Sequence, residues 1–305
     1  KQPPGARSHA AGSSEPVVLG RHQTIAHVKA RPGGRHTASS PWLPDVGGKI
    51  TAKSAIIIDA DTGEPLYELA SDMPRQPAST IKVLTAMIAL KSLDMADWVQ
   101  VSSRAAGMPR SKIYLDTRKS YRANDLINAV LLASANDASV ALAEKIAGSE
   151  EEFAEMMTLR AHLWGADNTV CRTASGLTAS GQQSTARDLA TIFRHAMQDR
   201  DFAGRMRRTK IRASYGKLLR NHNKALWRID GAEGGKTGYT SAARQTYVGQ
   251  FSQEDKRIIV ALMGSETMWT DIEHLVNYGF TRQNRLHYAR KELERKGNRV
   301  ALAQE

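Results

Sequence analysis

The amino-acid sequence predicts an α+β fold in which a mostly helical segment is inserted between two parts of one sheet. Two strand patterns occur early in the region that we expect to be ordered, and three more occur near its end. The segment between them repeats its apolar residues every three to four positions, which is typical of amphipathic helices. Because strands precede and follow this helical segment, we expect them to meet in one sheet.

The first predicted elements are a hairpin and a buried helix. Residues 55–60 are rich in isoleucine, residues 61–63 form an Asp-Thr-Gly turn, and residues 65–70 form a second run, which together indicate a hairpin. A helix is then predicted over residues 80–93, where apolar residues surround most of the helical cylinder. Ser79 stands in the first turn of this buried helix, which would hold its side chain rigidly.

Further helices, then strands and a closing helix are predicted after this point. Their boundaries rest on Gly148 as a helix stop, Ser184 as an N-cap and Gly279 as the stop of the closing helix. The helices are expected at 125–132, 138–147, 184–198 and 269–278, and the strands at 234–240, 246–252 and 257–264.

Both ends of the chain differ in composition from the folded domain that we expect at 46–285. Residues 1–45 hold six of the ten prolines and carry six Lys or Arg against two acids, which predicts a disordered basic linker. Its four histidines lack regular spacing and flanking cysteines, so they do not indicate a metal site. Residues 286–305 carry five Lys or Arg against three acids, which favours a charged, solvated helical extension over a membrane-lying helix.

The overall composition restricts the classes of function. The chain has 305 residues, of which 41% are hydrophobic, and contains no apolar run of about 18 residues that would span a membrane. The net charge is +12, but no dense basic run is interleaved with aromatics, so we expect no nucleic-acid partner. Cys171 is the single cysteine, which excludes an intrachain disulfide and a cysteine-rich metal site. We expect neither a metal nor a cofactor.

The first chemical motif is Ser79-x-x-Lys82. It places a hydroxyl and an amine one helical turn apart, which can make a serine nucleophilic without a histidine. The pattern alone is common, and a second copy occurs at Ser214-x-x-Lys217. This copy lies in a polar stretch with a glycine inside the motif, so we interpret it as incidental.

Two further motifs follow in a fixed order, and each has a purely structural alternative. Ser134-Ala-Asn136 precedes an apolar helix, and the Ser134–Asp137 spacing is also that of a helix capping box. Lys236-Thr-Gly238 lies at the head of a predicted strand among several glycines, which is also plain turn chemistry. At a sheet edge, however, such a strand presents N–H and C=O groups to an extended peptide, and its Lys and Thr side chains can bind a carboxylate.

In this order the motifs make the chain resemble the D-alanyl-D-alanine carboxypeptidases, the low-molecular-weight penicillin-binding serine peptidases of the S11 type. The resemblance covers about residues 50–282. It implies a β-lactamase/transpeptidase-like fold, with an antiparallel sheet flanked by helices and an inserted, mostly helical subdomain. The stretches that carry the resemblance are 59–63, 77–82, 134–144, 147–150, 175–177, 184–189, 235–240 and 277–280.

The resemblance also implies a reaction on peptidoglycan stem peptides. Ser79 would attack the carbonyl between two terminal D-alanines, Lys82 would accept its proton, and water would release the acyl group from the enzyme. A Lys82 amine beside a cationic Lys236 in a partly dry cleft should have a lowered pKa. β-Lactams would be covalent inhibitors of the same serine. An extracytoplasmic location would follow, with a signal segment removed before Lys1 and possible contact of the basic termini with the cell wall or a membrane surface.

The remaining implied roles concern the leaving group and the substrate. Ser134 would relay a proton to the leaving amine, and Asn136 would orient Lys82 and the substrate amide. The oxyanion would lie between the backbone N–H groups of Ser79 and Tyr239. The implied catalytic residues are Ser79, Lys82, Ser134 and Asn136, and the implied substrate-binding residues are Lys236, Thr237, Gly238, Tyr239 and Arg257.

Specific residues distinguish this function from others on the same scaffold. A class A β-lactamase needs a Glu-x-x-Leu-Asn stretch between the second and third motifs, and none occurs there. A D,D-endopeptidase that cleaves peptidoglycan cross-links would use the same residues and stays open. A non-catalytic peptidoglycan-binding module is disfavoured because every implied catalytic residue is present. Ala135 and Arg244 stand where the family commonly has glycine, and the bulky Arg244 leaves the substrate preference open.

Overall fold

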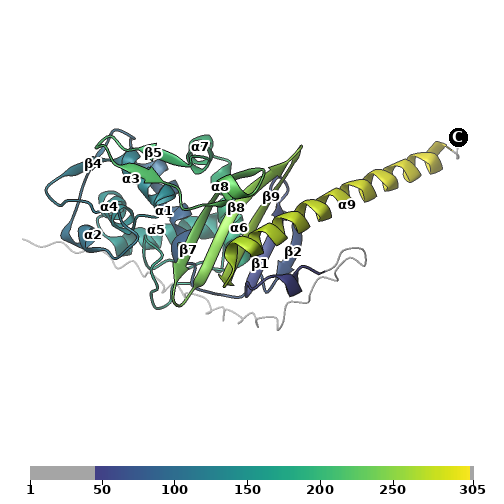
Figure 1. Ribbon diagram of the computed structural model, residues 1–305, viewed down its shortest axis with the longest axis horizontal. Coiled ribbons are helices and arrows are strands. Elements are labelled where there is room, and N and C mark those ends of the chain that lie inside the picture. The colour runs from purple at the N-terminus through teal and green to yellow at the C-terminus, as the bar shows by residue number, and fades with distance from the viewer. Residues whose placement is uncertain (1–44, 303–305) are drawn as a thin grey trace, which may run out of the picture. The chain divides into compact units, whose positions relative to one another are not determined.

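The structure, a computed structural model, describes residues 45–302, so the linker expected at 1–45 lies outside the described residues except for Asp45 (Figure 1). In chain order the described elements are η1 Gly47–Lys49, β1 Ser54–Asp59, β2 Pro65–Leu69, η2 Ala78–Ile81, α1 Lys82–Ser92, β3 Trp98–Gln100, α2 Ser103–Gly107, β4 Ser120–Arg122, α3 Ala123–Leu132, α4 Asn136–Ala147, α5 Glu150–Leu163, α6 Ala186–Met197, α7 Arg200–Met206, β5 Lys210–Arg212, β6 Leu218–Arg220, α8 Ala225–Arg228, β7 Ala232–Thr240, β8 Arg244–Gln253, β9 Lys256–Ser265 and α9 Met268–Leu302.

Five strands form one antiparallel sheet in the order β2-β1-β9-β8-β7. The early strand β1 pairs with the late strand β9, with Ile56 opposite Ala261. The helices α1 to α7 come from the chain segment between these strands, which confirms the predicted α+β fold and its helical insertion (Figure 1). β7 lies at one edge, so its outer side faces no other strand of this sheet.

The two faces of the sheet are buried by different elements, because successive side chains of a strand point to opposite faces. Tyr247 and Leu262 lie on the face that packs against α9, with Ile272 in the same apolar cluster. Val248 lies on the other face, in the cluster that includes α1 and α6. Lys236 of β7 is paired with Val248, which directs its side chain toward the helical segment.

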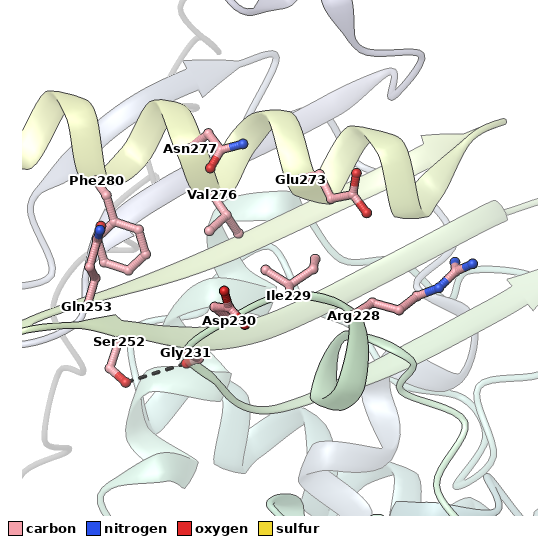
Figure 2. A pocket seen from close by; sticks show the side chains of 10 residues that line it. All are labelled: Arg228, Ile229, Asp230, Gly231, Ser252, Gln253, Glu273, Val276, Asn277 and Phe280. Atoms are coloured by element: carbon pink, nitrogen blue, oxygen red, sulfur yellow. Dashed lines mark hydrogen bonds between the residues drawn. The ribbon is translucent and has the colours of Figure 1, made fainter.

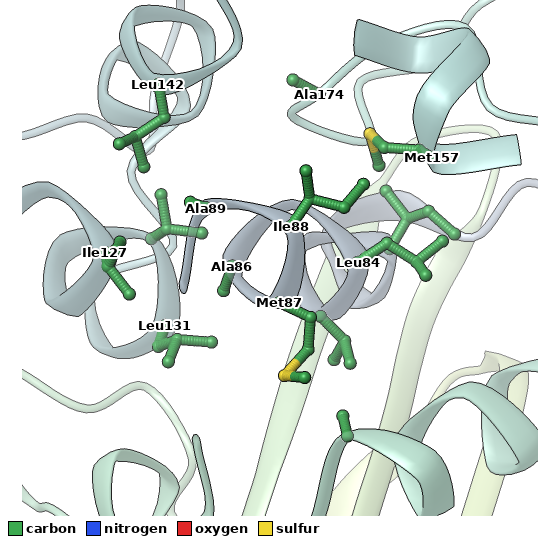
Figure 3. Close-up of a cluster of buried hydrophobic side chains, with 14 of the residues drawn as sticks. Leu84, Ala86, Met87, Ile88, Ala89, Ile127, Leu131, Leu142, Met157 and Ala174 are labelled. Carbon is green, nitrogen blue, oxygen red and sulfur yellow. The ribbon is translucent and has the colours of Figure 1, made fainter. Parts of the chain in front are cut away.

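Helix α1 is buried on nearly all sides, as its apolar pattern predicted. Every residue from Lys82 to Ala89 is buried. Figure 3 shows α1 between side chains of neighbouring helices, with Met157 of α5 on the side of Leu84 and Ile88 and Leu142 of α4 on the side of Ala89. Each buried Leu or Ile contributes roughly 1.5–3 kcal/mol relative to an exposed one. The turn that carries Ser79, directly before α1, is therefore mounted on a deeply buried helix.

The predicted end of the closing helix at Gly279 is wrong, because α9 continues through this residue to Leu302. A Cβ at position 279 would lie 2.7 Å from Ile258 Cδ1 and 3.0 Å from Ile57 Cγ2. Glycine at this position therefore lets the helix approach the sheet closely and does not end it. The charged segment expected at 286–305 continues the same helix as far as it is described.

Of two other predicted helix boundaries, one is confirmed and the other is wrong. Gly148 ends α4 with φ +87°, which confirms it as a stop. Thr185, and not Ser184, caps α6, since its hydroxyl accepts a hydrogen bond from the Asp188 backbone N–H. The Ser184 hydroxyl instead lies 2.9 Å from Thr169 Oγ1. Among the described residues, no helix is both long and apolar enough to cross a membrane.

Candidate active site

Ser79 and Lys82 lie in direct contact where the 3-10 turn η2 continues into α1. Lys82 Nζ lies 2.9 Å from Ser79 Oγ, as the one-turn spacing predicted. Ser79 is half-buried, whereas Lys82 is fully buried. The Thr80 hydroxyl donates to the Pro77 carbonyl at 2.6 Å and closes the turn from within. Ser79 is thus partly exposed to solvent, and the buried Lys82 amine lies directly against its hydroxyl.

The Lys82 amine has two further oxygen partners that come from distant parts of the chain. Asn136 Oδ1 accepts from it at 2.7 Å and the Ser175 backbone carbonyl accepts at 2.5 Å. Burial lowers the pKa of Lys82 well below its usual value, and the nearby charge of Lys236 lowers it further. The direction agrees with the prediction from sequence, although burial is the larger cause.

Ser134 does not form the predicted capping box. Its backbone has φ +55°, the N-cap position of α4 is Ala135, and no side chain caps that helix. Instead, the Ser134 hydroxyl accepts a hydrogen bond from Lys236 Nζ at 2.9 Å. The Asp137 carboxylate is turned to the backbone N–H groups of Ile113, Leu115 and Ala138. The second motif therefore points its hydroxyl toward the third motif.

Lys236 is the second buried amine of the site. Its Nζ donates to Ser134 Oγ and, at 2.8 Å, to the Thr237 carbonyl. Burial lowers its pKa to about 7. An amine with this pKa carries a charge over only part of the neutral pH range, which is unusual for lysine and typical of functional sites.

The edge strand β7 comes close to the serine turn at Gly238. A Cβ at this position would lie 2.8 Å from the Ser79 backbone nitrogen, so only glycine permits the approach. Thr237 is half-buried beside it, and Tyr239 is 59% exposed. Because β7 is an edge strand, groups on its outer side are free to pair with an added peptide strand.

Arg257 is not brought to this site, and the expectation that it lies there is corrected. Through the strand register, Thr237 is level with Leu262 of β9. Arg257 lies five residues from Leu262 along the strand, a separation of about 17 Å at 3.4 Å per residue. Its guanidinium pairs with Asp61 at 2.5 Å on the surface. The strand was predicted correctly, but the arginine occupies its opposite end.

Arg244 opens β8 directly across the hairpin from Thr240, with φ +57°. Its guanidinium pairs with Glu266 at 2.5 Å, and both side chains are about half exposed. Thr240 in turn receives a hydrogen bond from the Thr178 hydroxyl at 2.9 Å. Arg244 therefore lies just beyond the β7 segment that approaches Ser79, with its charge already paired.

The second Ser-x-x-Lys copy has separate structural roles for its two residues. The Ser214 hydroxyl hydrogen-bonds to the carboxylate of Asp125. Lys217 Nζ donates to the Ile113 carbonyl at 2.6 Å. The structure thus uses both residues to fasten the β5–β6 hairpin, in agreement with their interpretation as incidental.

A surface groove outside the three motifs has none of their residues in its lining. Figure 2 shows this groove, of about 410 Å³, between α9 and the segment that precedes β7. Its polar lining includes Asp230, Glu273 and Asn277, while Ser252 and Gln253 belong to the same end of the sheet as Arg257. Among residues 45–302, no three His, Cys, Asp or Glu side chains are grouped to hold a metal ion.

The residue that sequence reasoning missed is Ser175, whose contribution is a backbone carbonyl. A backbone carbonyl has no side-chain signature, so the sequence does not mark its role. Gly176 follows with φ +76°, and a Cβ there would lie 2.0 Å from the Ala78 carbonyl oxygen. The loop is therefore packed tightly against the serine turn. This packing places the Ser175 carbonyl beside the Lys82 amine.

Comparison with known proteins agrees with this geometry. The family model Peptidase_S11, described as D-alanyl-D-alanine carboxypeptidase, matches residues 36–267. A D-alanyl-D-alanine carboxypeptidase of Mycobacterium tuberculosis is 36% identical over 246 residues, which are 75% of this chain and 82% of the relative. One from Bacillus subtilis is 34% identical over 231 residues, covering 71% of this chain and 58% of the relative. The chain thus spans little more than half of the Bacillus subtilis protein.

Solved structures show the same fold. The crystal structure of a Mycobacterium tuberculosis D-alanyl-D-alanine carboxypeptidase matches with a TM-score of 0.75 and 33% identity, covering 82% of this chain and 96% of that one. Penicillin-binding protein D2 from Listeria monocytogenes in its ampicillin-bound form matches with a TM-score of 0.71 and 26% identity, covering 78% and 100%. The chain therefore belongs to the S11 peptidase family of D-alanyl-D-alanine carboxypeptidases.

Proposed function

We propose that this chain is a serine-type D-Ala-D-Ala carboxypeptidase that removes the terminal D-alanine from peptidoglycan stem peptides through an acyl-enzyme on Ser79. The observation that carries the proposal is the contact between Ser79 and a fully buried Lys82, 2.9 Å apart. Burial favours the neutral amine, which is the form that can accept the serine proton. Membership of the S11 family supports the same reaction.

In the first half of the reaction, Ser79 Oγ forms a bond to the carbonyl carbon of the penultimate D-alanine as its proton moves to Lys82. Backbone N–H groups of Ser79 and Tyr239 stabilise the resulting oxyanion. The peptide C–N bond then breaks and the leaving amine takes a proton through Ser134, which Lys236 contacts at 2.9 Å. In the second half, water hydrolyses the ester and restores the Ser79 hydroxyl.

Substrate binding in this proposal uses the outer side of β7. The stem peptide lies along this edge strand, with Thr237 and the charge of Lys236 at the terminal carboxylate. Asn136 holds Lys82 through its Oδ1 atom and presents its amide to the substrate. Arg257 has no part in this binding because it lies at the other end of β9.

The proposal extends to inhibitors and location. A β-lactam would acylate the same serine, as the ampicillin-bound relative from Listeria monocytogenes supports. Since the substrate is peptidoglycan, the protein would act outside the cytoplasm. Contact of the basic terminal segments with the cell wall or a membrane surface belongs to the same proposal, and most of these segments lie outside the described residues.

Labelling with a fluorescent penicillin tests the nucleophile. We expect a covalent adduct on the wild-type protein and on Ser214→Ala, but none on Ser79→Ala. A correctly folded wild-type protein without any adduct would contradict the proposal. Incubation with a pentapeptide and with a cross-linked peptide dimer then identifies the bond: released D-alanine supports a carboxypeptidase, whereas cleavage of the dimer alone would make it an endopeptidase.

A further inference from the structure

Glu150 is a buried carboxylate outside the three motifs. It binds the residue directly before Ser175, whose carbonyl contacts Lys82. Glu150 begins helix α5, and its side chain is only 5% exposed. Its Oε1 atom accepts a hydrogen bond from the Ala174 backbone N–H at 2.9 Å. Its other oxygen accepts from Arg104 Nη2 at 3.0 Å. Burial of a carboxylate is costly unless it is paired and hydrogen-bonded, and Glu150 has both kinds of partner.

The segment that Glu150 holds is fixed from several directions. The Ala174 carbonyl accepts from the Thr85 hydroxyl of α1 at 2.7 Å, one helical turn after Lys82. The next carbonyl, of Ser175, is the one that accepts from Lys82 at 2.5 Å. Glu150 and Lys82 therefore bind two neighbouring residues of one backbone segment, Ala174 and Ser175.

This carbonyl matters because of the geometry of a neutral amine. A neutral lysine has two N–H groups and one lone pair. The Ser175 carbonyl can only accept a hydrogen bond. Asn136 Oδ1 also accepts, since the other amide atom, Nδ2, donates to the Pro109 carbonyl at 3.0 Å. With both N–H groups engaged, the lone pair of Lys82 is left directed at Ser79 Oγ.

We propose that Glu150 is a positioning residue for the general base: it holds the Ala174–Ser175 backbone in place so that the Ser175 carbonyl keeps the lone pair of Lys82 aimed at Ser79. This inference rests on the proposed function, in which Lys82 accepts the serine proton. Glu150 hydrogen-bonds to the Ala174 N–H and to Arg104, so it acts on Lys82 through the backbone and through its charge.

Three charged groups from different elements shift the pKa of Lys82. Lys236 of β7 lowers its pKa, whereas Glu150 of α5 and Asp137 of α4 raise it. His222, between β6 and α8, also lies near the two lysines, but burial and their charges lower its pKa to about 4, so it is neutral at neutral pH. Loss of the Glu150 charge alone should therefore lower the pKa of Lys82 and extend acylation to lower pH.

The test compares three variants by the second-order rate constant of acylation by a fluorescent penicillin across the pH range. Glu150→Gln keeps an oxygen for the Ala174 N–H but has no charge. The maximum rate on the plateau of its pH profile should therefore stay high. The acid limb, where the rate rises as Lys82 loses its proton, should move to lower pH. Glu150→Ala loses the hydrogen bond as well, and its plateau should fall by about tenfold to a hundredfold because the base is misplaced.

Glu151→Gln is the matched control. Glu151 neighbours Glu150 and pairs with the same Arg104 at 2.6 Å, but its side chain is 65% exposed. This variant should keep both the wild-type plateau and the wild-type acid limb. If Glu150→Ala fails to fold in circular dichroism, Glu150→Leu replaces it, because leucine fills the buried space but cannot accept from the Ala174 N–H, and its plateau should fall in the same way.

An unmoved acid limb in Glu150→Gln, a wild-type plateau in folded Glu150→Ala, or equal effects in Glu151→Gln would each overturn the inference. These results all presuppose that the wild-type protein is acylated. Absence of wild-type acylation would contradict the proposed function itself, so the two failures are distinguishable.

Discussion

Gly238 and Ser79 approach each other so closely that no side chain fits between them. A Cβ at position 238 would lie 2.8 Å from the Ser79 backbone nitrogen and 2.5 Å from Thr246 Oγ1. Thr246 itself donates to the Pro77 carbonyl at 2.9 Å, which ties β8 to the same turn. The serine turn and the edge strand can therefore form one cleft only because residue 238 has no side chain.

Gly238→Ala should displace β7 from the serine turn. Because the oxyanion and the substrate both depend on this spacing, we expect acylation by a fluorescent penicillin to slow by about a hundredfold. Gly204→Ala is the control, since a Cβ there meets nothing within 4 Å. Wild-type labelling of Gly238→Ala would show that the contact has no role in catalysis.

Gly176→Ala and Gly216→Ala separate a steric clash from backbone strain. Both glycines have positive φ, +76° and +90°, but only at 176 would a Cβ meet another atom, the Ala78 carbonyl oxygen at 2.0 Å. We expect Gly216→Ala to lower the free energy of unfolding by about 1 kcal/mol through strain alone. Gly176→Ala should lower it by about 3 kcal/mol or more, because the clash adds to the strain. Urea denaturation measures both, and equal losses would contradict the packing of this loop.

The rate of acylation should depend on pH with a bell-shaped profile. Lys82 must be neutral to accept a proton, so the rate rises as pH increases through its lowered pKa. Lys236 must be charged, and its pKa is about 7, so the rate falls again as pH passes that value. The two apparent values belong to the coupled pair of amines.

Lys236→Arg identifies the alkaline limb. A guanidinium keeps its charge across the tested range, so the fall near neutral pH should disappear even if the plateau is lower. Stopped-flow acylation at a series of pH values gives the profile. An alkaline limb that stays in place would assign it to a group other than Lys236.

Arg257→Ala and Thr237→Val test which end of the sheet binds the substrate carboxylate. Arg257 pairs with Asp61 on the surface, with about half of each side chain exposed, so its loss should leave KM unchanged. It should also change the stability by less than about 1 kcal/mol. Thr237→Val should raise KM for a D-alanyl-D-alanine peptide, because it removes a hydroxyl beside the carboxylate. A raised KM in Arg257→Ala would restore that arginine to the site.

Features encoded by neighbouring residues were predictable from the sequence. The hairpin before Ser79, the buried helix after it and the three late strands follow from apolar periodicity and turn residues, and the structure confirms them. The Ser79–Lys82 contact also follows from local spacing, since one helical turn brings the two side chains together.

Features that depend on how distant segments pack could not be predicted in this way. The alternation of apolar residues predicts the strand that carries Arg257, but it does not show which end of that strand lies in the cleft. The Ser134 spacing fits a capping box, yet the backbone at φ +55° turns the hydroxyl to Lys236, 102 residues away. Gly279 has the composition of a stop signal but serves a close contact between helix and sheet.

The sequence by itself determined the individual strands and helices, the three motifs with their order, and the serine-lysine pair, because each element and each motif is set by residues within a few positions of one another. Only the tertiary structure decided that the Ser175 carbonyl contacts Lys82, that Glu150 binds the N–H of the preceding residue and that Arg257 lies elsewhere. The physical reason is that a backbone carbonyl and a buried carboxylate act through contacts across 93 and 24 residues, which no local pattern records.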